Sequence, residues 1–226
     1  MIKQNHKILI FGAGETAEIA LEYFTHDSPH EVVAFTVDGE YLKENSFNKL
    51  PVIPFEEISK SYSIDEHSCF VALSSDRLNR GRMQKYSEVK KKGFQLASYI
   101  STKAFVWRTA QFGENCFILE NNVIQHGVTI GNNVTLWSGN HVGHRSKISD
   151  HTFISSQVVV PGFCEIGEAC FVGVNSTLAD HVKIASDCLI GAGTVVTKDV
   201  NEGIILRGNP AEASGVGTHR YFRLKE

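Results

Sequence analysis

The chain has 226 residues, and 42% of them are hydrophobic, which suits one large or two small domains with packed cores. Its net charge of −3 argues against non-specific binding of nucleic acid. The first apolar stretch, Ile8 to Phe11, is too short for a signal peptide or a membrane span. We therefore expect a cytosolic protein without membrane insertion.

The elements expected in the first part of the chain alternate between strands and helices. Buried strands are predicted over 7–11, 31–38, 69–74 and 95–100, and helices over 15–25, 55–61 and 79–92. Strands that alternate with helices favour a parallel sheet. Residues 1–98 are therefore predicted to form a small Rossmann-like α/β domain.

The first predicted strand ends in a glycine-rich turn. Gly12 and Gly14 lie in this turn, Glu15 opens the helix, and Asp38 ends the second strand. This pattern resembles a dinucleotide fingerprint, in which phosphate lies at the helix N-terminus and an acid binds the ribose. One hypothesis is that Gly14, Glu15 and Asp38 contact a nucleotide. The alternative is a packing turn that only joins strand to helix.

A basic cluster follows the third predicted strand of this domain. It consists of Arg77, Arg80 and Arg82. These side chains either face a phosphate at the carboxyl edge of the strand or form the solvated start of a helix. We favour the second interpretation.

The second half of the chain has a period of six. Every sixth residue from 100 to 196 is apolar. A period of six fits neither an α-helix nor a simple alternating strand, and it is typical of hexapeptide repeats in a β-helix with three short strands per coil. We predict a left-handed parallel β-helix over 99–203, in which residues 18 apart stack, and a C-terminal tail or cap over 204–226.

Small residues recur at two places in the repeat. Six glycines directly follow the apolar residue, where a tight corner favours glycine: Gly113, Gly131, Gly143, Gly167, Gly173 and Gly191. Four of the five cysteines come four places after it, where other repeats have valine, serine or threonine: Cys116, Cys164, Cys170 and Cys188. We interpret this second position as inward-facing, so that the cysteines pack rather than form disulfides or bind metal.

One column of the predicted β-helix carries two histidines. His126 and His144 are 18 apart, and Gly162 is the next member of the column. Stacked coils place them about 4.8 Å apart. Either they are surface residues at a corner, or a histidine base lies beneath a backbone N–H that can stabilise an oxyanion.

The chain resembles the bacterial nucleotide-sugar acetyltransferases, which include the UDP-4-amino-sugar N-acetyltransferases and the sialic-acid O-acetyltransferase group. The βαβ start, the hexapeptide repeat, the Val-Gly-His at 142–144 and the Gly-Asn-Pro-Ala at 208–211 carry this resemblance. It implies a homotrimer that uses acetyl-CoA, without a metal, to acetylate a nucleotide-linked amino sugar. Such a product would serve polysaccharide or glycan synthesis.

The resemblance also implies roles for particular residues. His144 would be the general base, and the N–H of Gly162 would be the oxyanion donor. Val174 and Ala192 would line the groove for acetyl-CoA, and Lys198 would contact its phosphates unless it is a solvated surface charge.

The sequence departs from the family pattern around the base. The family often places an acidic residue beside the histidine, where this chain has Arg145. Asp150 or a neighbouring subunit is a candidate for the missing carboxylate. The family's second histidine, which touches the acyl donor, is replaced by Phe153. His141 and His151 are the candidates to compensate, and His126 and His141 are assigned to substrate binding.

Three other functions remain open. The first is an O-acetyltransferase that acts on a sugar hydroxyl. The second is a γ-carbonic-anhydrase-like zinc hydratase, although the HxxxxH pair typical of that class is absent from the sequence. The third is a non-catalytic β-helix scaffold whose N-terminal domain binds a nucleotide.

Overall fold

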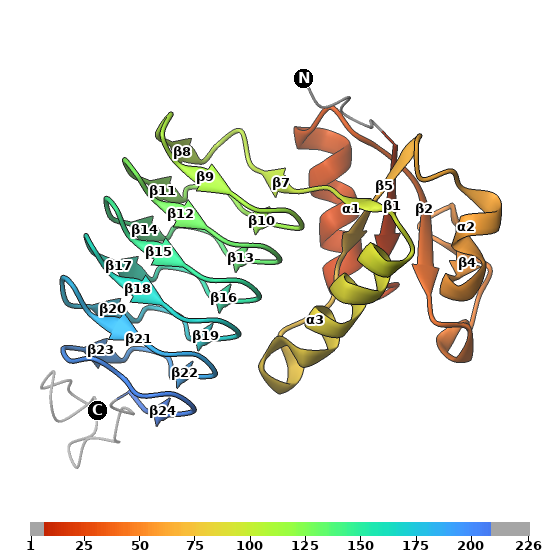
Figure 1. Ribbon diagram of the computed structural model, residues 1–226. Coiled ribbons are helices and arrows are strands. Elements are labelled where there is room, and N and C mark those ends of the chain that lie inside the picture. Colours follow the sequence, from red (N-terminus) through yellow and green to blue (C-terminus); the bar gives the residue numbers. More distant parts are fainter. Residues whose placement is uncertain (1–6, 209–226) are drawn as a thin grey trace, which may run out of the picture.

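The structure is a computed structural model that describes residues 7–208. An α/β domain lies beside a β-helix (Figure 1). The strands of the α/β domain are β1 (Lys7–Phe11), β2 (Glu31–Val37), β3 (Ser46–Phe47), β4 (Leu50–Pro54), β5 (His67–Val71) and β6 (Gln95–Leu96). Its helices are α1 (Glu15–Asp27), α2 (Ile58–Ser61) and α3 (Asp76–Lys91), with the 3-10 turns η1 (Gly39–Tyr41) and η2 (Phe55–Glu57).

The sheet of the α/β domain has the order β3-β4-β2-β1-β5-β6, and all pairs except β3–β4 are parallel. Strand β1 lies in the middle and is buried at four of its five residues, because the sheet is covered on both faces. The predicted parallel α/β domain is confirmed. The β3–β4 hairpin is an addition that the sequence pattern did not predict.

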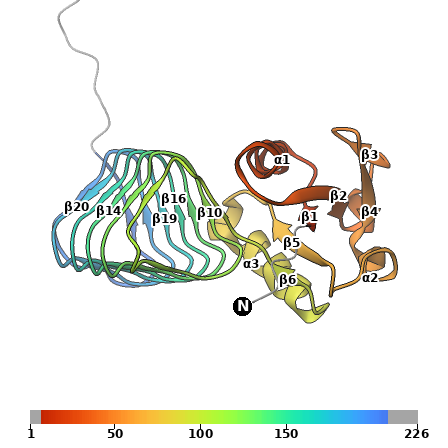
Figure 2. The same ribbon diagram turned by 90° about the horizontal axis from the view of Figure 1, so that it is seen from above.

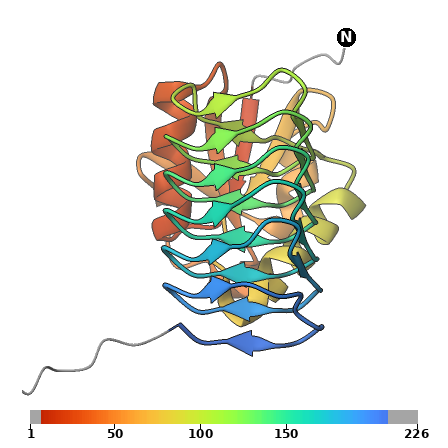
Figure 3. The ribbon, with the colours of Figure 1, turned by 90° about the vertical axis from the view of Figure 1, so that its left-hand side faces the viewer.

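The β-helix consists of three sheets of two-residue strands that stack coil on coil (Figure 3). The domain-facing sheet contains β7 (Tyr99–Ile100), β10 (Phe117–Ile118), β13 (Thr135–Leu136), β16 (Phe153–Ile154), β19 (Phe171–Val172), β22 (Leu189–Ile190) and β24 (Ile205–Leu206). The second sheet contains β8 (Phe105–Val106), β11 (Val123–Ile124), β14 (His141–Val142), β17 (Val159–Val160), β20 (Thr177–Leu178) and β23 (Val195–Val196). The third sheet contains β9 (Gln111–Phe112), β12 (Thr129–Ile130), β15 (Lys147–Ile148), β18 (Glu165–Ile166) and β21 (Lys183–Ile184).

The register of these sheets confirms that residues 18 apart stack. Ile124 pairs with Val142, for example, and Ile130 pairs with Ile148. The repeat-setting apolar residues form one continuous buried core along the β-helix. The four cysteines of the repeat are fully buried in the same core, as predicted. Strand β24 continues the domain-facing sheet past residue 203, and residues 209–226 of the predicted tail lie outside the described part of the chain.

The explanation that the sequence suggested for the repeat glycines was wrong. The left-handed backbone conformation falls two residues later, at every sixth position from Asn115 to Gly193. Gly143 and Gly167 are required for a different reason, which is the closeness of the next coil. A Cβ atom at Gly143 would stand 2.6 Å from the backbone nitrogen of Gly162, and one at Gly167 would stand 2.5 Å from that of Ser186.

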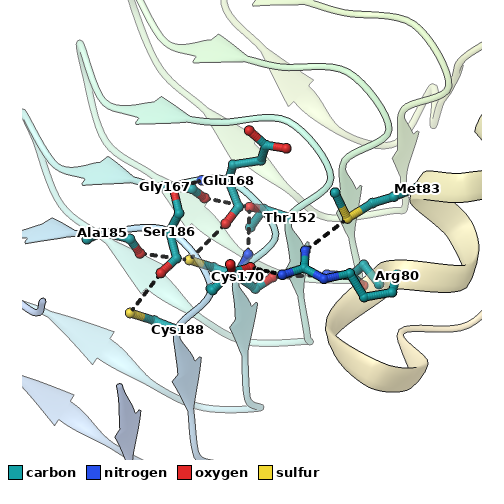
Figure 4. A network of polar contacts seen from close by, with 11 residues as sticks. Arg80, Met83, Thr152, Gly167, Glu168, Cys170, Ala185, Ser186 and Cys188 are labelled. Atoms are coloured by element: carbon teal, nitrogen blue, oxygen red, sulfur yellow. Dashed lines mark hydrogen bonds and ion pairs between the residues drawn. The ribbon is translucent and has the colours of Figure 1, made fainter. Parts of the chain in front are cut away.

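Helices α1 and α3 join the α/β domain to the β-helix (Figure 2). The interpretation of the basic cluster as a solvated helix start was wrong for Arg82, which is 2% exposed and bonds the hydroxyl of Thr135. Arg80 forms an ion pair with Asp187 of the β-helix. Figure 4 shows Arg80 reaching from α3 toward the coils that carry Cys170. These contacts fix how the α/β domain meets the β-helix.

Candidate functional site

The histidine column lies on the corner that joins the second sheet to the third sheet. This distal corner comprises the turns at 125–128, 143–146, 161–164 and 179–182, on the side of the β-helix that faces away from the α/β domain (Figure 3). His126 and His144 are both exposed there, one coil apart. The hydroxyl oxygen of Thr109 lies 2.8 Å from Nδ1 of His126. The corner therefore presents two imidazoles to solvent in one line.

The ring of His144 lies directly over Gly162. A Cβ atom at Gly162 would stand 2.5 Å from Cε1 and 2.8 Å from Nε2 of that ring. Every other residue at position 162 would displace the imidazole. The 18-residue stacking rule thus brings His144 and Gly162 into contact, with the ring beside the backbone of the next coil.

The N–H of Gly162 has no acceptor among the described residues. One coil earlier, the N–H of His144 donates to Oε1 of Gln125 at 2.9 Å. The residue that corresponds to Gln125 in the next coil is Gly143, which has no side chain to accept a hydrogen bond. An unpaired N–H beside an imidazole is what stabilisation of an oxyanion requires.

The distal corner also carries an aromatic stack that the sequence analysis missed. The rings of Phe163 and His181 lie parallel, 5.0 Å apart, and Phe163 meets the ring of His144 edge-on at 4.9 Å. The guanidinium of Arg145 lies 5.8 Å from the centre of the Phe163 ring. Arg145, Phe163 and His181 are 18 apart, so the rule that found His144 would also have found them.

The candidates for a carboxylate and a second histidine lie elsewhere in the chain. Asp150 accepts hydrogen bonds from the backbone and side-chain amides of Asn132 at a different corner. His151 lies at the domain junction, where its ring packs edge-on against Tyr86. His141 is half-buried on β14, in the second sheet. Within one chain, Asp150 and His151 are therefore not placed beside His144.

The three residues assigned to acetyl-CoA lie on two corners. Val174 and Ala192 are exposed one coil apart, on the turns between the domain-facing and second sheets. Lys198 is exposed in the column of His144, three coils further on. The structure brings Val174 and Ala192 together and leaves Lys198 on the distal corner.

The α/β domain contains a cavity of about 880 Å³ at the carboxyl ends of β1 and β2. It opens beside β1, where the strand order changes direction between β1 and β5, which is the usual ligand-binding position in such sheets. Asp38 lines this cavity, as do Gly12 and Ala13 of the turn. Gly14 and Glu15 are not among its lining residues, so the structure supports only Asp38 of the three predicted positions as a cavity residue.

Three of the seven charged residues that line the cavity form ion pairs with one another. Nζ of Lys85 lies 2.7 Å from Asp38 and 2.6 Å from Glu88. Burial opposes the charge on Lys85, but its hydrogen bonds to these two carboxylates raise the pKa of the amine. Glu56 accepts a hydrogen bond from the N–H of Gly39. Lys85 thus pairs two of the cavity's carboxylates, whereas Glu40 and Glu56 have no ion-pair partner among the described residues.

Within residues 7–208, no group of three histidine, cysteine, aspartate or glutamate side chains could hold a metal ion. The described helices include none that is long and apolar enough to cross a membrane. The distal corner offers the imidazoles of His126, His144 and His181, the unpaired N–H of Gly162, the ring of Phe163 and the guanidinium of Arg145.

Comparison with known proteins gives matches to hexapeptide-repeat acyltransferases. The family model "Bacterial transferase hexapeptide (six repeats)" matches residues 109–144 and 163–198. A curated relative, the acyl-[acyl-carrier-protein]–UDP-N-acetylglucosamine O-acyltransferase of Stutzerimonas stutzeri, is 27% identical over 107 residues, which are 42% of each chain. The chain thus spans less than half the length of the curated relatives that it matches.

Two solved structures are similar over almost the whole chain. The acetyltransferase domain of PglB from Neisseria gonorrhoeae is 26% identical and has a TM-score of 0.81, covering 92% of this chain and 99% of that one. A perosamine N-acetyltransferase from Caulobacter crescentus, solved with CoA and GDP-perosamine, is 23% identical and has a TM-score of 0.81, covering 93% and 97%. The α/β domain followed by a left-handed β-helix, and the resemblance to acetyltransferases of the hexapeptide type, are confirmed.

Proposed function

We propose that this protein is an acetyl-CoA-dependent acetyltransferase that acts on the amino group of a nucleotide-linked sugar. The observation that carries the proposal is the imidazole of His144 lying over Gly162, whose N–H has no acceptor among the described residues. A base and an oxyanion donor side by side are the two groups that acyl transfer needs. The similarity to an acetyltransferase structure over 92% of the chain supports the same reaction.

The proposed reaction is a direct transfer. The amino nitrogen of the sugar attacks the thioester carbon of acetyl-CoA, and His144 takes a proton from that nitrogen. The N–H of Gly162 donates to the oxyanion that forms. Collapse of the tetrahedral intermediate breaks the carbon–sulfur bond, and CoA leaves as a thiol with the proton from His144. No metal is needed in this scheme.

A route through an acyl-cysteine fits the structure poorly. All five cysteines are buried. Burial raises the pKa of the Cys116 thiol to about 11 and that of Cys170 to about 12, so neither supplies a thiolate near neutral pH. Free thiols are typical of a reducing compartment, and we place the reaction in the cytosol.

The substrates are assigned to different surfaces. We propose that the cavity with Asp38 holds the nucleotide, that His126 and His141 lie near the sugar, and that acetyl-CoA contacts Val174, Ala192 and Lys198. The perosamine enzyme was solved with GDP-perosamine, which supports a nucleotide-linked amino sugar as the substrate class. We infer a role in the synthesis of polysaccharide or glycan.

We propose that the protein is a homotrimer and that its active site is shared between copies. The cavity belongs to the α/β domain. The distal corner lies on the side of the β-helix that faces away from that domain (Figure 1), so a second copy would bring a distal corner to the cavity. The outward side of the second sheet carries exposed apolar residues that suit an interface between copies: Phe105, Val159 and Val195.

The test is a thiol-release assay with acetyl-CoA and a panel of UDP-, GDP- and dTDP-linked amino sugars, with the matching hydroxyl sugars as controls. We expect thiol release that depends on one amino sugar and exceeds background hydrolysis. Release with a hydroxyl sugar alone would instead identify an O-acetyltransferase. An absence of acceptor-dependent release, together with no binding of acetyl-CoA in calorimetry, would favour a non-catalytic scaffold.

A further inference from the structure

A left-handed segment precedes the regular part of α3. Arg77, Leu78 and Asn79 have φ angles of 48°, 49° and 63°, although none of them is glycine. This backbone conformation is costly for L-residues because Cβ crowds the backbone. Residues held in such strained conformations are concentrated at functional sites. Three such residues in a row persist only where other contacts hold them in place.

The β-helix supplies those contacts. The side chain of Asn79 is fully buried, and its amide donates to the backbone oxygen of Cys170 at 3.3 Å. Its oxygen accepts a hydrogen bond of 3.2 Å from Arg82. The next residue, Arg80, forms an ion pair with Asp187 on a neighbouring coil. The left-handed segment 77–79 is therefore anchored on the other domain.

The segment presents Arg77 to the cavity of the α/β domain. Arg77 is exposed and lines this cavity together with Lys85 and Lys92. Lys85 is held by Asp38 and Glu88, and Lys92 bonds a backbone oxygen. Arg77 is the one cavity-lining cation without a hydrogen-bond or ion-pair partner among residues 7–208.

An unpaired guanidinium in this position suits a phosphate. The cavity lies where doubly wound sheets bind the phosphates of nucleotides. A guanidinium presents a planar set of donors that matches two phosphate oxygens at once. Lys85 partly neutralises Asp38 and Glu88, while the carboxylates of Glu40 and Glu56 in the same lining have no ion-pair partner among residues 7–208.

We propose that Arg77 binds the diphosphate of the nucleotide-linked sugar, and that its anchored left-handed segment aims it into the cavity. The proposal rests on the proposed function, which supplies a diphosphate as the ligand. Arg77 acts in binding and touches no reacting atom.

The test measures the binding of nucleosides, nucleoside monophosphates and nucleoside diphosphates of uracil, guanine and thymine by calorimetry. For the base that binds, wild-type affinity should increase with each phosphate. Arg77→Gln should weaken diphosphate binding by on the order of tenfold and leave nucleoside binding unchanged. Lys91→Gln is the matched control, because it removes a charge from an exposed residue of α3 that does not line the cavity.

If Arg77→Gln has the same ratio of diphosphate affinity to nucleoside affinity as the wild type, the assignment of Arg77 is wrong. The anchoring is tested by Asn79→Ala, which should weaken diphosphate binding while Arg77 is still present. A folded Asn79→Ala protein, shown by its thermal melt, that keeps full diphosphate affinity would refute the anchoring.

An assay of acetyl transfer distinguishes an error in the role of Arg77 from an error in the proposed function. We expect Arg77→Gln to raise the KM for the nucleotide sugar and to retain kcat. If the wild type transfers acetyl groups and Arg77→Gln shows an unchanged KM, the inference is wrong and the proposed function stands. If the wild type neither transfers acetyl groups nor binds a nucleoside diphosphate, both are wrong.

Discussion

Two missing side chains shape the distal corner at the scale of single residues. Gly162 leaves room for the ring of His144, and Gly143 leaves the N–H of Gly162 without the acceptor that Gln125 supplies one coil earlier. Glycine is required at both places by close approach and not by backbone angle, because neither has a positive φ. The proposed oxyanion site thus depends on the absence of a side chain at both Gly143 and Gly162.

Gly143→Ala tests whether the open N–H of Gly162 serves as the oxyanion donor. The added methyl group would stand 2.6 Å from the nitrogen of Gly162 and would obstruct or displace its N–H. We expect kcat to fall by on the order of tenfold or more, as on loss of an oxyanion donor, with little change in KM. The measurement is steady-state thiol release.

Gly167→Ala is the matched control for Gly143→Ala. Its Cβ would meet the backbone of the next coil just as closely, at 2.5 Å, on a corner without His144. Both variants should have a lower Tm than the wild type. Only Gly143→Ala should also have a lower kcat than Gly167→Ala. Equal losses of kcat in the two would show that the effect is merely structural.

At the scale of elements, Asp27 anchors the end of α1 on the β-helix. Its carboxylate accepts hydrogen bonds from the hydroxyl of Tyr99 at 2.5 Å, the hydroxyl of Ser101 at 3.0 Å and the backbone N–H of Thr102 at 3.0 Å. Partial burial opposes ionisation, but the bonds from Thr102, Tyr99 and Ser101 outweigh it and lower the pKa of Asp27 to about 2. The ionised form therefore stabilises the domain junction.

The stability that Asp27 contributes should disappear in acid. Because the folded pKa lies below the ordinary value of 3.8, this contribution is present above that value and is lost as the pH falls toward about 2. We expect Asp27→Asn to have a lower Tm than the wild type near neutral pH and the gap to narrow in acid. Thermal melts from about pH 6 to pH 3 measure it. A gap that stays constant over this range would contradict the role of the charge.

The elements show what sequence periodicity can and cannot predict. The period of six predicted the strands, the buried cysteines and the contact between His144 and Gly162, because stacking in a β-helix follows from sequence spacing alone. The same rule applies to Phe163 and His181, which were missed only because it was not extended to their column. Burial of Arg82 could not be predicted, since it depends on contacts between segments far apart in the sequence.

At the scale of the whole molecule, the two candidate regions are separated by the β-helix. The cavity with Asp38 belongs to the α/β domain. His144 lies on the turn between β14 and β15, at the distal corner; this corner faces away from the α/β domain (Figures 1 and 3). Sequence alone could place both regions in the chain but not on opposite sides of the molecule. Assembly is therefore part of the proposed activity.

Loss of assembly should abolish activity. Val195 is 69% exposed on the second sheet, and a charge there would oppose burial of this face against another copy. We expect light scattering to give three times the chain mass of 25.0 kDa for the wild type and less for Val195→Glu, with thiol release lost in parallel. Lys147→Glu, on the exposed side of the third sheet, is the control. A fully active monomer would contradict the shared site.

The proposed reaction depends on His144 as the base for acetyl transfer. The kcat of His144→Asn in the thiol-release assay tests this role, with oligomer mass and acetyl-CoA affinity measured on the same sample. We predict a fall in kcat of on the order of 10²-fold or more, with mass and affinity unchanged. Near-normal turnover by His144→Asn would show that His144 is not the base.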